Sequence, residues 1–156
     1  MKLAFSWAVP VCLTLLSGVC AAQPGNLTGS WHLNVAKSHW GATPKPHSVV
    51  LTIDHKEPSL QYQGSVIYAN EDAREFGFYG AFDGKSYAMT RSFGSGSITL
   101  KRIDGLTFDS VFTTDDGRSV EKTRTILSRD GKTLTREIRV QSPDGNRNWT
   151  EVYERK

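Results

Sequence analysis

The stretch that decides the fold is DGRSVEKTRTILSRDGKTLTREIRVQSPDGNRNWTEVYERK, residues 116–156. It contains three Asp-Gly pairs, which begin at residues 116, 130 and 144 and are therefore 14 residues apart. Asp-Gly supplies the positive φ angles of tight hairpin turns at low steric cost. This spacing is typical of strand–turn–strand repetition, so the stretch predicts three consecutive antiparallel strands.

The same punctuation extends towards the N-terminus, with further Asp-Gly pairs at residues 83 and 104. Period-two alternation and turn signals together predict ten strands, and no segment after the N-terminal region carries a sustained apolar stripe of helical period. Gly64 is expected to mark a bend or bulge. The predicted strands cover residues 27–36, 47–54, 60–68, 75–82, 86–90, 97–103, 106–113, 119–128, 133–141 and 147–155.

The predicted fold class is all-β, an up-and-down antiparallel β-barrel of about 8–10 strands, because closing the sheet removes both exposed edges. A two-sheet sandwich is the alternative. Sandwiches favour long crossover connections, and this chain has almost none.

The first 22 residues have the pattern of a signal peptide, which leaves residues 23–156 as one domain. Lys2 gives a positive start, residues 3–16 are apolar, and Cys20-Ala21-Ala22 forms a plausible cleavage site. The apolar run is too short to indicate a membrane span. We therefore expect an exported protein, periplasmic or secreted, that is not stably inserted in a membrane and carries no lipid on Cys20.

Composition excludes several kinds of chemistry. Cleavage would remove Cys12 and Cys20, the only cysteines, and with them thiol catalysis and thiolate metal sites. Without Lys2, 18 of the 19 Lys and Arg remain against 16 Asp and Glu, and no basic stripe indicates nucleic-acid binding. No zinc-type histidine spacing and no Gly-x-Ser-x-Gly elbow occurs. We expect no metal, no cofactor and no catalytic residue of these types.

Arginines that alternate in phase with apolar residues suggest a functional lumen. Such residues are Arg102, Arg124 and Arg136, and the last strand adds Glu151 and Arg155 in phase with Trp149 and Tyr153. A buried cation needs a carboxylate, a water-filled cavity or an anionic ligand. The alternative is that these arginines lie at the rim and extend into solvent. The expected apolar lining is Tyr62, Tyr68, Phe76 and Phe78.

Gly29-Ser30-Trp31 resembles the opening of lipocalin and calycin barrels, whose first strand begins with Gly-x-Trp. The resemblance implies that Trp31 closes the barrel floor and packs against Arg155. The chain also resembles small exported bacterial proteins of unassigned function that are called lipocalin-like, through residues 29–38, 100–104, 130–135 and 152–154. The resemblance implies a barrel and transfers no catalytic residue.

These observations favour an exported, monomeric barrel that binds a small apolar or amphipathic ligand in its lumen, with an anionic head group as one option. Its polar anchors would be Arg102, Arg124 and Arg136. One alternative is an enzyme, an isomerase or hydrolase of a lipid-like substrate; another is an envelope protein that acts through its outer surface. A packed lumen would favour the outer surface, whereas an inward carboxylate, His or Tyr beside a cation would favour the enzyme.

Overall fold

Ten antiparallel strands make up the fold in the computed structural model, which describes residues 25–69 and 71–156. Each strand pairs with its neighbours along the chain, and the first pairs with the last, so the sheet closes. The predicted up-and-down antiparallel barrel is thus confirmed. The strands are β1 (Gly29–Leu33), β2 (Ser48–Lys56), β3 (Ser59–Ile67), β4 (Arg74–Ala81), β5 (Asp83–Arg91), β6 (Gly96–Arg102), β7 (Thr107–Thr114), β8 (Val120–Leu127), β9 (Thr133–Gln141) and β10 (Arg147–Arg155).

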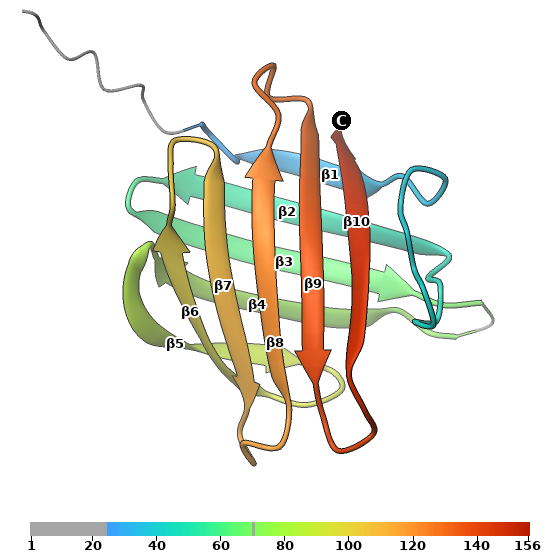
Figure 1. Cartoon of the computed structure of the whole chain (residues 1–156). Coiled ribbons are helices and arrows are strands. Elements are labelled where there is room, and N and C mark those ends of the chain that lie inside the picture. The colour runs from blue at the N-terminus through green and yellow to red at the C-terminus, as the bar shows by residue number, and fades with distance from the viewer. Residues whose placement is uncertain (1–24, 70) are drawn as a thin grey trace, which may run out of the picture.

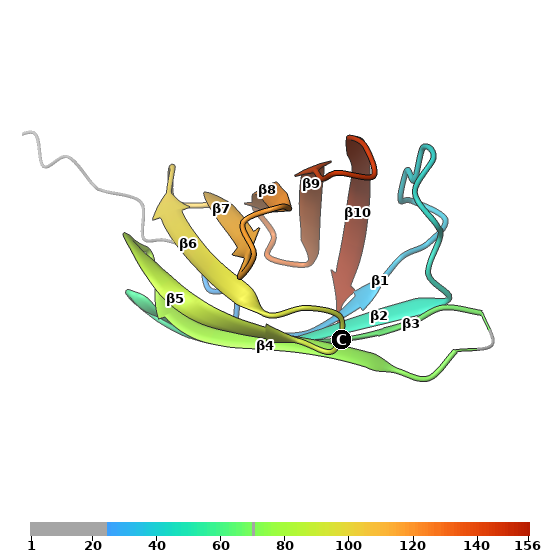
Figure 2. The same cartoon turned by 90° about the horizontal axis from the view of Figure 1, so that it is seen from below.

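The barrel is flattened into two layers. β2–β5 form one curved layer that faces β6–β10, and strands of the two layers cross steeply (Figures 1 and 2). The predicted signal peptide, residues 1–22, lies outside the described residues. Across the described ranges, no helix is both long enough and apolar enough to span a membrane.

The period-two pattern of the sequence separates the inner face from the outer face. On β2, for example, Val49, Leu51 and Ile53 are buried, while Thr52 and Asp54 at alternate positions are exposed. Full burial of one such side chain stabilises the fold by about 1.5–3 kcal/mol. The alternation therefore fixes which face of each strand lines the barrel, because a one-residue slip would expose the whole apolar set.

In most Asp-Gly pairs the aspartate side chain stabilises the turn by accepting a backbone hydrogen bond. In four of the five pairs, Oδ1 accepts a hydrogen bond of 2.7–3.0 Å from the backbone N–H two residues later. The following glycine has a positive φ of 69° at both Gly117 and Gly131. The four aspartates are Asp83, Asp104, Asp116 and Asp130.

These hydrogen bonds predict a loss of stability in acid. Bonds from the Lys85 and Leu106 N–H groups lower the pKa of Asp83 and Asp104, and bonds from the Thr114 and Ser128 hydroxyls do so for Asp116 and Asp130. Because the folded pKa is the lower one, the stabilisation is present above the unfolded pKa of about 4 and is lost as pH falls through the folded value.

We expect the melting temperature to fall steeply below about pH 4, and to fall less in a variant with Asn at 104, 116 and 130, since Asn keeps the acceptor but does not titrate. Circular dichroism melts over a pH series would measure this. Asp144→Asn is the matched control, because the Asp144 side chain accepts no hydrogen bond from the described residues. If the melting temperatures of the parent and the triple variant fell equally with pH, these aspartates would not be the source of the acid sensitivity.

The bend or bulge predicted at Gly64 is wrong, and the irregular strand pairing lies between β5 and β6. Gly64 pairs regularly with Leu51 on β2 and with Phe76 on β4. The Phe76 ring occupies the space that a Cβ at residue 64 would need, so the glycine permits close packing and makes no bend. The register shift occurs between β5 and β6, around Asp83 and Ser86.

Trp31 closes one end of the barrel, as the resemblance implied. Its side chain is 0% exposed, and its Nε1 donates a 2.9 Å hydrogen bond to the carbonyl of Leu27. The guanidinium carbon of Arg155 lies 4.4 Å from the centre of the Trp31 ring, a cation–π contact between strands that pair directly. The N-terminal segment before β1 is thereby fixed across this end of the barrel.

Candidate ligand-binding cavity

The lumen holds a cavity of about 560 Å³. It reaches the end of the barrel opposite Trp31, where residues 40–46, the turns β3–β4, β5–β6 and β7–β8, and the adjoining ends of β9 and β10 contribute to its lining. We call this end the mouth. The cavity wall is largely apolar, and its apolar residues include Val66, Phe76, Phe78, Met89, Ile98 and Phe112.

Seven charged residues line the cavity, of which Glu71, Arg74 and Arg147 lie near the mouth. The other four, Arg91, Glu121, Arg136 and Glu151, form what we call the central charge cluster. Their side chains are only 11–18% exposed. Nη1 of Arg91 lies 3.1 Å from Oε2 of Glu121, and Nη1 of Arg136 lies 2.9 Å from Oε2 of Glu151. Nη2 of Arg136 also lies 3.9 Å from Oε1 of Glu121, so the two pairs form one network across β5, β8, β9 and β10.

Glu151 is the best-satisfied member of the cluster. Besides Arg136, its carboxylate accepts a 2.9 Å hydrogen bond from Trp149 Nε1 and a 2.8 Å bond from the Tyr153 hydroxyl. Burial, followed by the charge of Glu151, raises the pKa of Tyr153 well above its usual range, so this phenol stays a donor. Three donors hold the carboxylate in place, and its role is to anchor Arg136.

Tyr62 has a buried hydroxyl with no protein partner. The residue is 7% exposed, and its ring stacks on Phe78 with centroids 5.3 Å apart. No atom of the described residues forms a hydrogen bond with the hydroxyl. Burial, opposed in part by the charge of Arg136, raises the pKa of Tyr62 to about 12. At neutral pH the group is therefore a neutral phenol that lines the cavity.

Five of the seven predicted site residues line the cavity. The four predicted aromatic residues do so from the layer β2–β5 and the turn after β3, and Arg136 does so from β9. Tyr68 lies nearer the mouth, with the guanidinium of Arg74 5.6 Å from its ring centre. The predicted aromatic residues are Tyr62, Tyr68, Phe76 and Phe78.

The inward placement predicted for Arg124 is wrong. Its side chain is 51% exposed and makes two hydrogen bonds to Asp109, at 2.8 and 2.9 Å, on the outer face of β7 and β8. The residues of β8 that face inwards are Glu121, Thr123, Thr125 and Leu127. Cross-strand pairing of Thr123 with Ile138 and of Leu127 with Leu134 fixes that phase.

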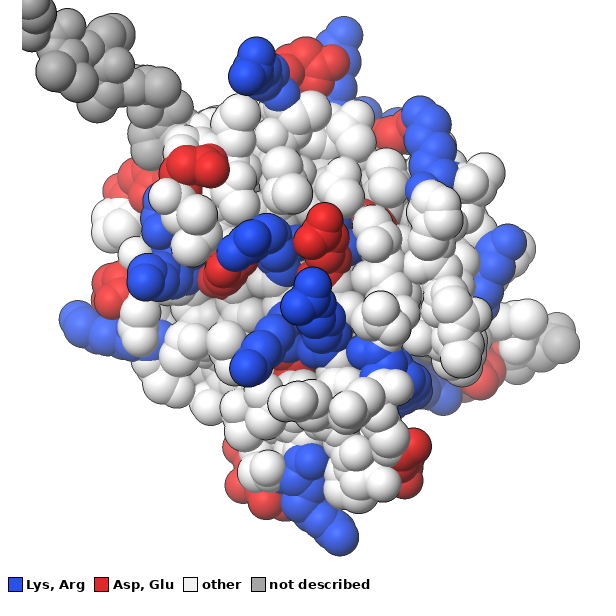
Figure 3. All heavy atoms as spheres, viewed as in Figure 1, with Lys and Arg blue, Asp and Glu red and all other residues white. Residues whose placement is uncertain are grey.

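Arg124 belongs instead to a row of alternating charges on the outside of the barrel. Neighbouring strands β6–β9 place Lys101, Asp109, Arg124 and Glu137 side by side in that order. Figure 3 shows positive and negative side chains mixed over this face. The row gives each charge an opposite neighbour, which is the favourable cross-strand arrangement.

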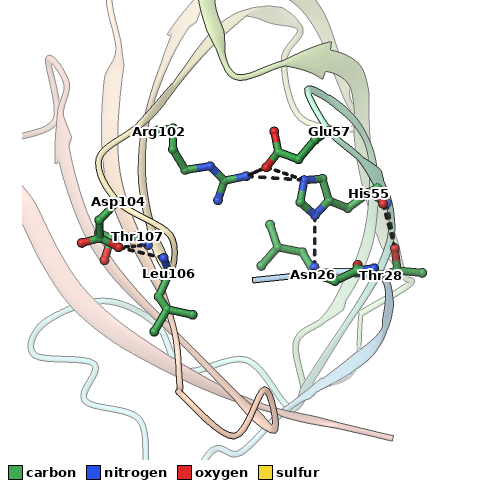
Figure 4. A network of polar contacts seen from close by, with 9 residues as sticks. Asn26, Thr28, His55, Glu57, Arg102, Asp104, Leu106 and Thr107 are labelled. Atoms are coloured by element: carbon green, nitrogen blue, oxygen red, sulfur yellow. Dashed lines mark hydrogen bonds and ion pairs between the residues drawn. The ribbon is translucent and has the colours of Figure 1, made fainter. Parts of the chain in front are cut away.

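Arg102 faces inwards but does not line the cavity, so the structure does not bring it together with Arg136 and the predicted aromatic residues. It pairs with Glu57 near the closed end, and its guanidinium stacks 3.9 Å from the centre of the Phe82 ring. His55 joins this network: its Nε2 lies 3.0 Å from Glu57 Oε1, and its Nδ1 accepts the Leu27 N–H (Figure 4). With a carboxylate at hand, Arg102 needs no ligand, and the network ties the N-terminal segment to β2.

Sequence reasoning missed Arg91 and Glu121. The strand predicted at residues 86–90 ended one residue before Arg91, although Met89 and Arg91 share the inner phase of β5. Glu121 was overlooked because Val120 and Ile126 made the opposite face of β8 look like the inner one. Arg91 also stacks 3.6 Å from the centre of the Phe112 ring, so its guanidinium is held on two sides.

The fold and the cavity define a closed, ten-stranded antiparallel β-barrel with an open mouth, consistent with a calycin-like fold. No protein-family model and no curated protein sequence matches the chain. Among the described residues, no group of three or more His, Cys, Asp or Glu side chains is placed to hold a metal ion.

Proposed function

We propose that this protein binds a small amphipathic molecule in the barrel lumen, with the apolar part against Phe76, Phe78 and Met89 and a polar group beside Tyr62. The observation that carries the proposal is a mainly apolar cavity of about 560 Å³ with a buried, unpartnered phenol in its wall. Small-molecule sites typically have this size and this combination of apolar lining and few polar groups. We place the activity in an exported, monomeric protein that needs no cofactor.

The size of the cavity argues against a purely structural lumen. Protein interiors are normally packed to the density of organic crystals, and voids larger than a water molecule are few. An unfilled apolar lumen loses dispersion contacts along its whole wall. A protein that acted only through its outer surface would gain stability from a larger side chain at an inward position such as Ser110.

An enzyme is the second candidate, because Glu121, Glu151 and Tyr62 all lie near Arg136. Two of these groups are poorly suited to acid–base work. The Glu151 carboxylate already accepts three hydrogen bonds, and Tyr62, with a pKa of about 12, would not act as a base at neutral pH. Glu121 is the remaining candidate, so turnover of a lipid-like ester that is lost in Glu121→Gln would favour the enzyme.

Saturable binding of the fluorophore Nile red tests the proposal, and the lumen should be the site. Ser110 lines the cavity from β7, so Ser110→Trp should fill the space and weaken binding by at least about tenfold, or about 1.4 kcal/mol. Ser97→Trp, an equal change on the exposed face of β6, should leave binding unchanged. Equal loss in both variants, or no saturable binding by the parent protein, would contradict lumen binding.

A further inference from the structure

We propose that the lumen selects ligands whose buried polar group is an uncharged hydrogen-bond acceptor, such as an ester or ketone oxygen, over carboxylates. The hydroxyl of Tyr62 is the donor that recognises this acceptor. The inference rests on the proposed lumen binding and names the class of ligand that the site accepts. It departs from the anionic head group that the sequence suggested, because that expectation treated the inward cations as unpaired.

The central charge cluster is already balanced. Arg91 and Arg136 supply two positive charges, and Glu121 and Glu151 supply two carboxylates at 3.1 and 2.9 Å from them. All four groups come from β5, β8, β9 and β10, so the barrel itself brings them together. The cluster therefore offers an incoming ligand no surplus positive charge.

A carboxylate buried beside the cluster would have to displace one of these protein carboxylates, because the further cation Arg147 is exposed at the mouth. Breaking a buried ion pair by removing one partner is strongly unfavourable, because the other charge is left uncompensated. Displacing Glu151 would also leave the Trp149 Nε1–H and the Tyr153 hydroxyl without their acceptor. An uncharged acceptor can enter with every existing pair intact, and this difference is the basis of the selectivity.

The unpartnered polar atoms in the cavity wall are groups that can donate. Four such atoms have no hydrogen-bond partner among the described residues, and all belong to residues that line the cavity: the Tyr62 hydroxyl, Trp40 Nε1, Thr43 Oγ1 and Arg91 Nε. Indole N–H is a donor only, and the phenol stays protonated because burial raises its pKa. Buried polar groups are nearly always hydrogen-bonded, so the molecule that fills the lumen must supply acceptor oxygens.

Displacement of Nile red by three compounds of matched chain length tests the selectivity: methyl decanoate, decanoate and decane. We expect methyl decanoate to displace the fluorophore at a concentration at least about tenfold lower than decanoate, at a pH where decanoate is ionised. Decane measures the contribution of the apolar wall alone. Decanoate equal to or stronger than the ester would overturn the inference while leaving lumen binding intact.

Tyr62→Phe tests the named donor. Phe keeps the ring that stacks on Phe78 and removes only the hydroxyl, so affinity for methyl decanoate should fall by about 3- to 10-fold while affinity for decane is unchanged. Tyr79→Phe, the same change on the exposed outer face of β4, is the matched control. Unchanged ester affinity in Tyr62→Phe would remove Tyr62 as the recognition residue.

Glu121→Gln tests the charge argument in the opposite direction. Removing one carboxylate leaves the cluster with a surplus positive charge, so decanoate affinity should rise by about tenfold relative to ester affinity. Glu137→Gln makes the same change in net charge on the outer face of β9 and should have no effect. If Nile red binds in the lumen of the parent protein but none of the three compounds displaces it, the selectivity is overturned while lumen binding stands.

Discussion

Replacing Trp31 with alanine is expected to lower the free energy of unfolding by about 3–5 kcal/mol, the range for removing a buried aromatic side chain. The side chain is 0% exposed, so the change removes its transfer free energy and leaves a cavity at the closed end. The hydrogen bond to Leu27 and the cation–π contact with Arg155 are lost as well. Domains are typically stable by only about 5–15 kcal/mol, so the variant would be marginal.

Urea unfolding followed by circular dichroism would measure this loss. Trp31→Phe should recover part of the stability, because it keeps one aromatic ring but loses the pyrrole part of the indole and its N–H. Trp40→Ala is the control for removal of a tryptophan as such, since Trp40 lies at the mouth and is only partly buried. An unfolding midpoint in Trp31→Ala that matches the parent would show that Trp31 does not close the barrel.

The fold could be predicted from the sequence because its signals are local. The Asp-Gly turns and the alternation of residues such as Val49, Leu51 and Ile53 depend on neighbours in the chain, and both were read correctly. Closure also followed, since a run of short antiparallel strands with short connections leaves two edges that must be protected. The position of Trp31 and its contact with Arg155 follow from the resemblance to calycin barrels and agree with the structure.

The site was predicted less well because it depends on register between strands. β8 carries apolar residues on both faces, Val120 and Ile126 on one and Leu127 on the other, so alternation alone could not orient it. The pairing of Leu127 with Leu134 on β9 decides the phase and turns Arg124 outwards. Arg136 was placed correctly because Leu134 and Ile138 lie on its face of β9, while the opposite face carries only polar residues.

The sequence also does not show which carboxylate pairs with each inward arginine. Arg102 and Arg136 have the same local pattern, yet one pairs with Glu57 at the closed end and the other with Glu151 in the cavity. These pairings join residues that are distant in the chain, 45 positions apart in the first case. A carboxylate that compensates an inward cation is invisible until the strands are aligned, and the anionic ligand was inferred for that reason.

Replacing Glu151 with alanine is expected to lower the free energy of unfolding by about 3–5 kcal/mol, the range for breaking a buried ion pair by removing one partner. The carboxylate is the acceptor for Arg136, Trp149 and Tyr153 at 2.8–2.9 Å. The change leaves three donors unsatisfied and Arg136 with only the more distant Glu121, at 3.9 Å. Urea unfolding would measure the loss.

Glu154→Ala on the same strand is the matched control. Glu154 pairs with Lys37 in solvent, where an ion pair contributes at most about 1 kcal/mol. Glu151→Ala both removes the ion pair and leaves the buried Arg136 charge without its nearest carboxylate. The double variant Arg136→Leu, Glu151→Leu removes the pair without leaving that charge behind, so it separates the two effects. Replacing both members of a buried pair with apolar residues is often neutral or stabilising, so the double variant should be more stable than Glu151→Ala.

The same comparison shows whether the cluster exists for stability or for binding. If the double variant regains parental stability but loses its preference for an ester over a carboxylate, then the barrel does not need the buried charges in order to fold. Their retention would follow from ligand selection, because a paired and neutral cluster rejects anions while the Tyr62 hydroxyl accepts a neutral oxygen. A double variant less stable than Glu151→Ala would instead show that the pair stabilises the barrel by itself.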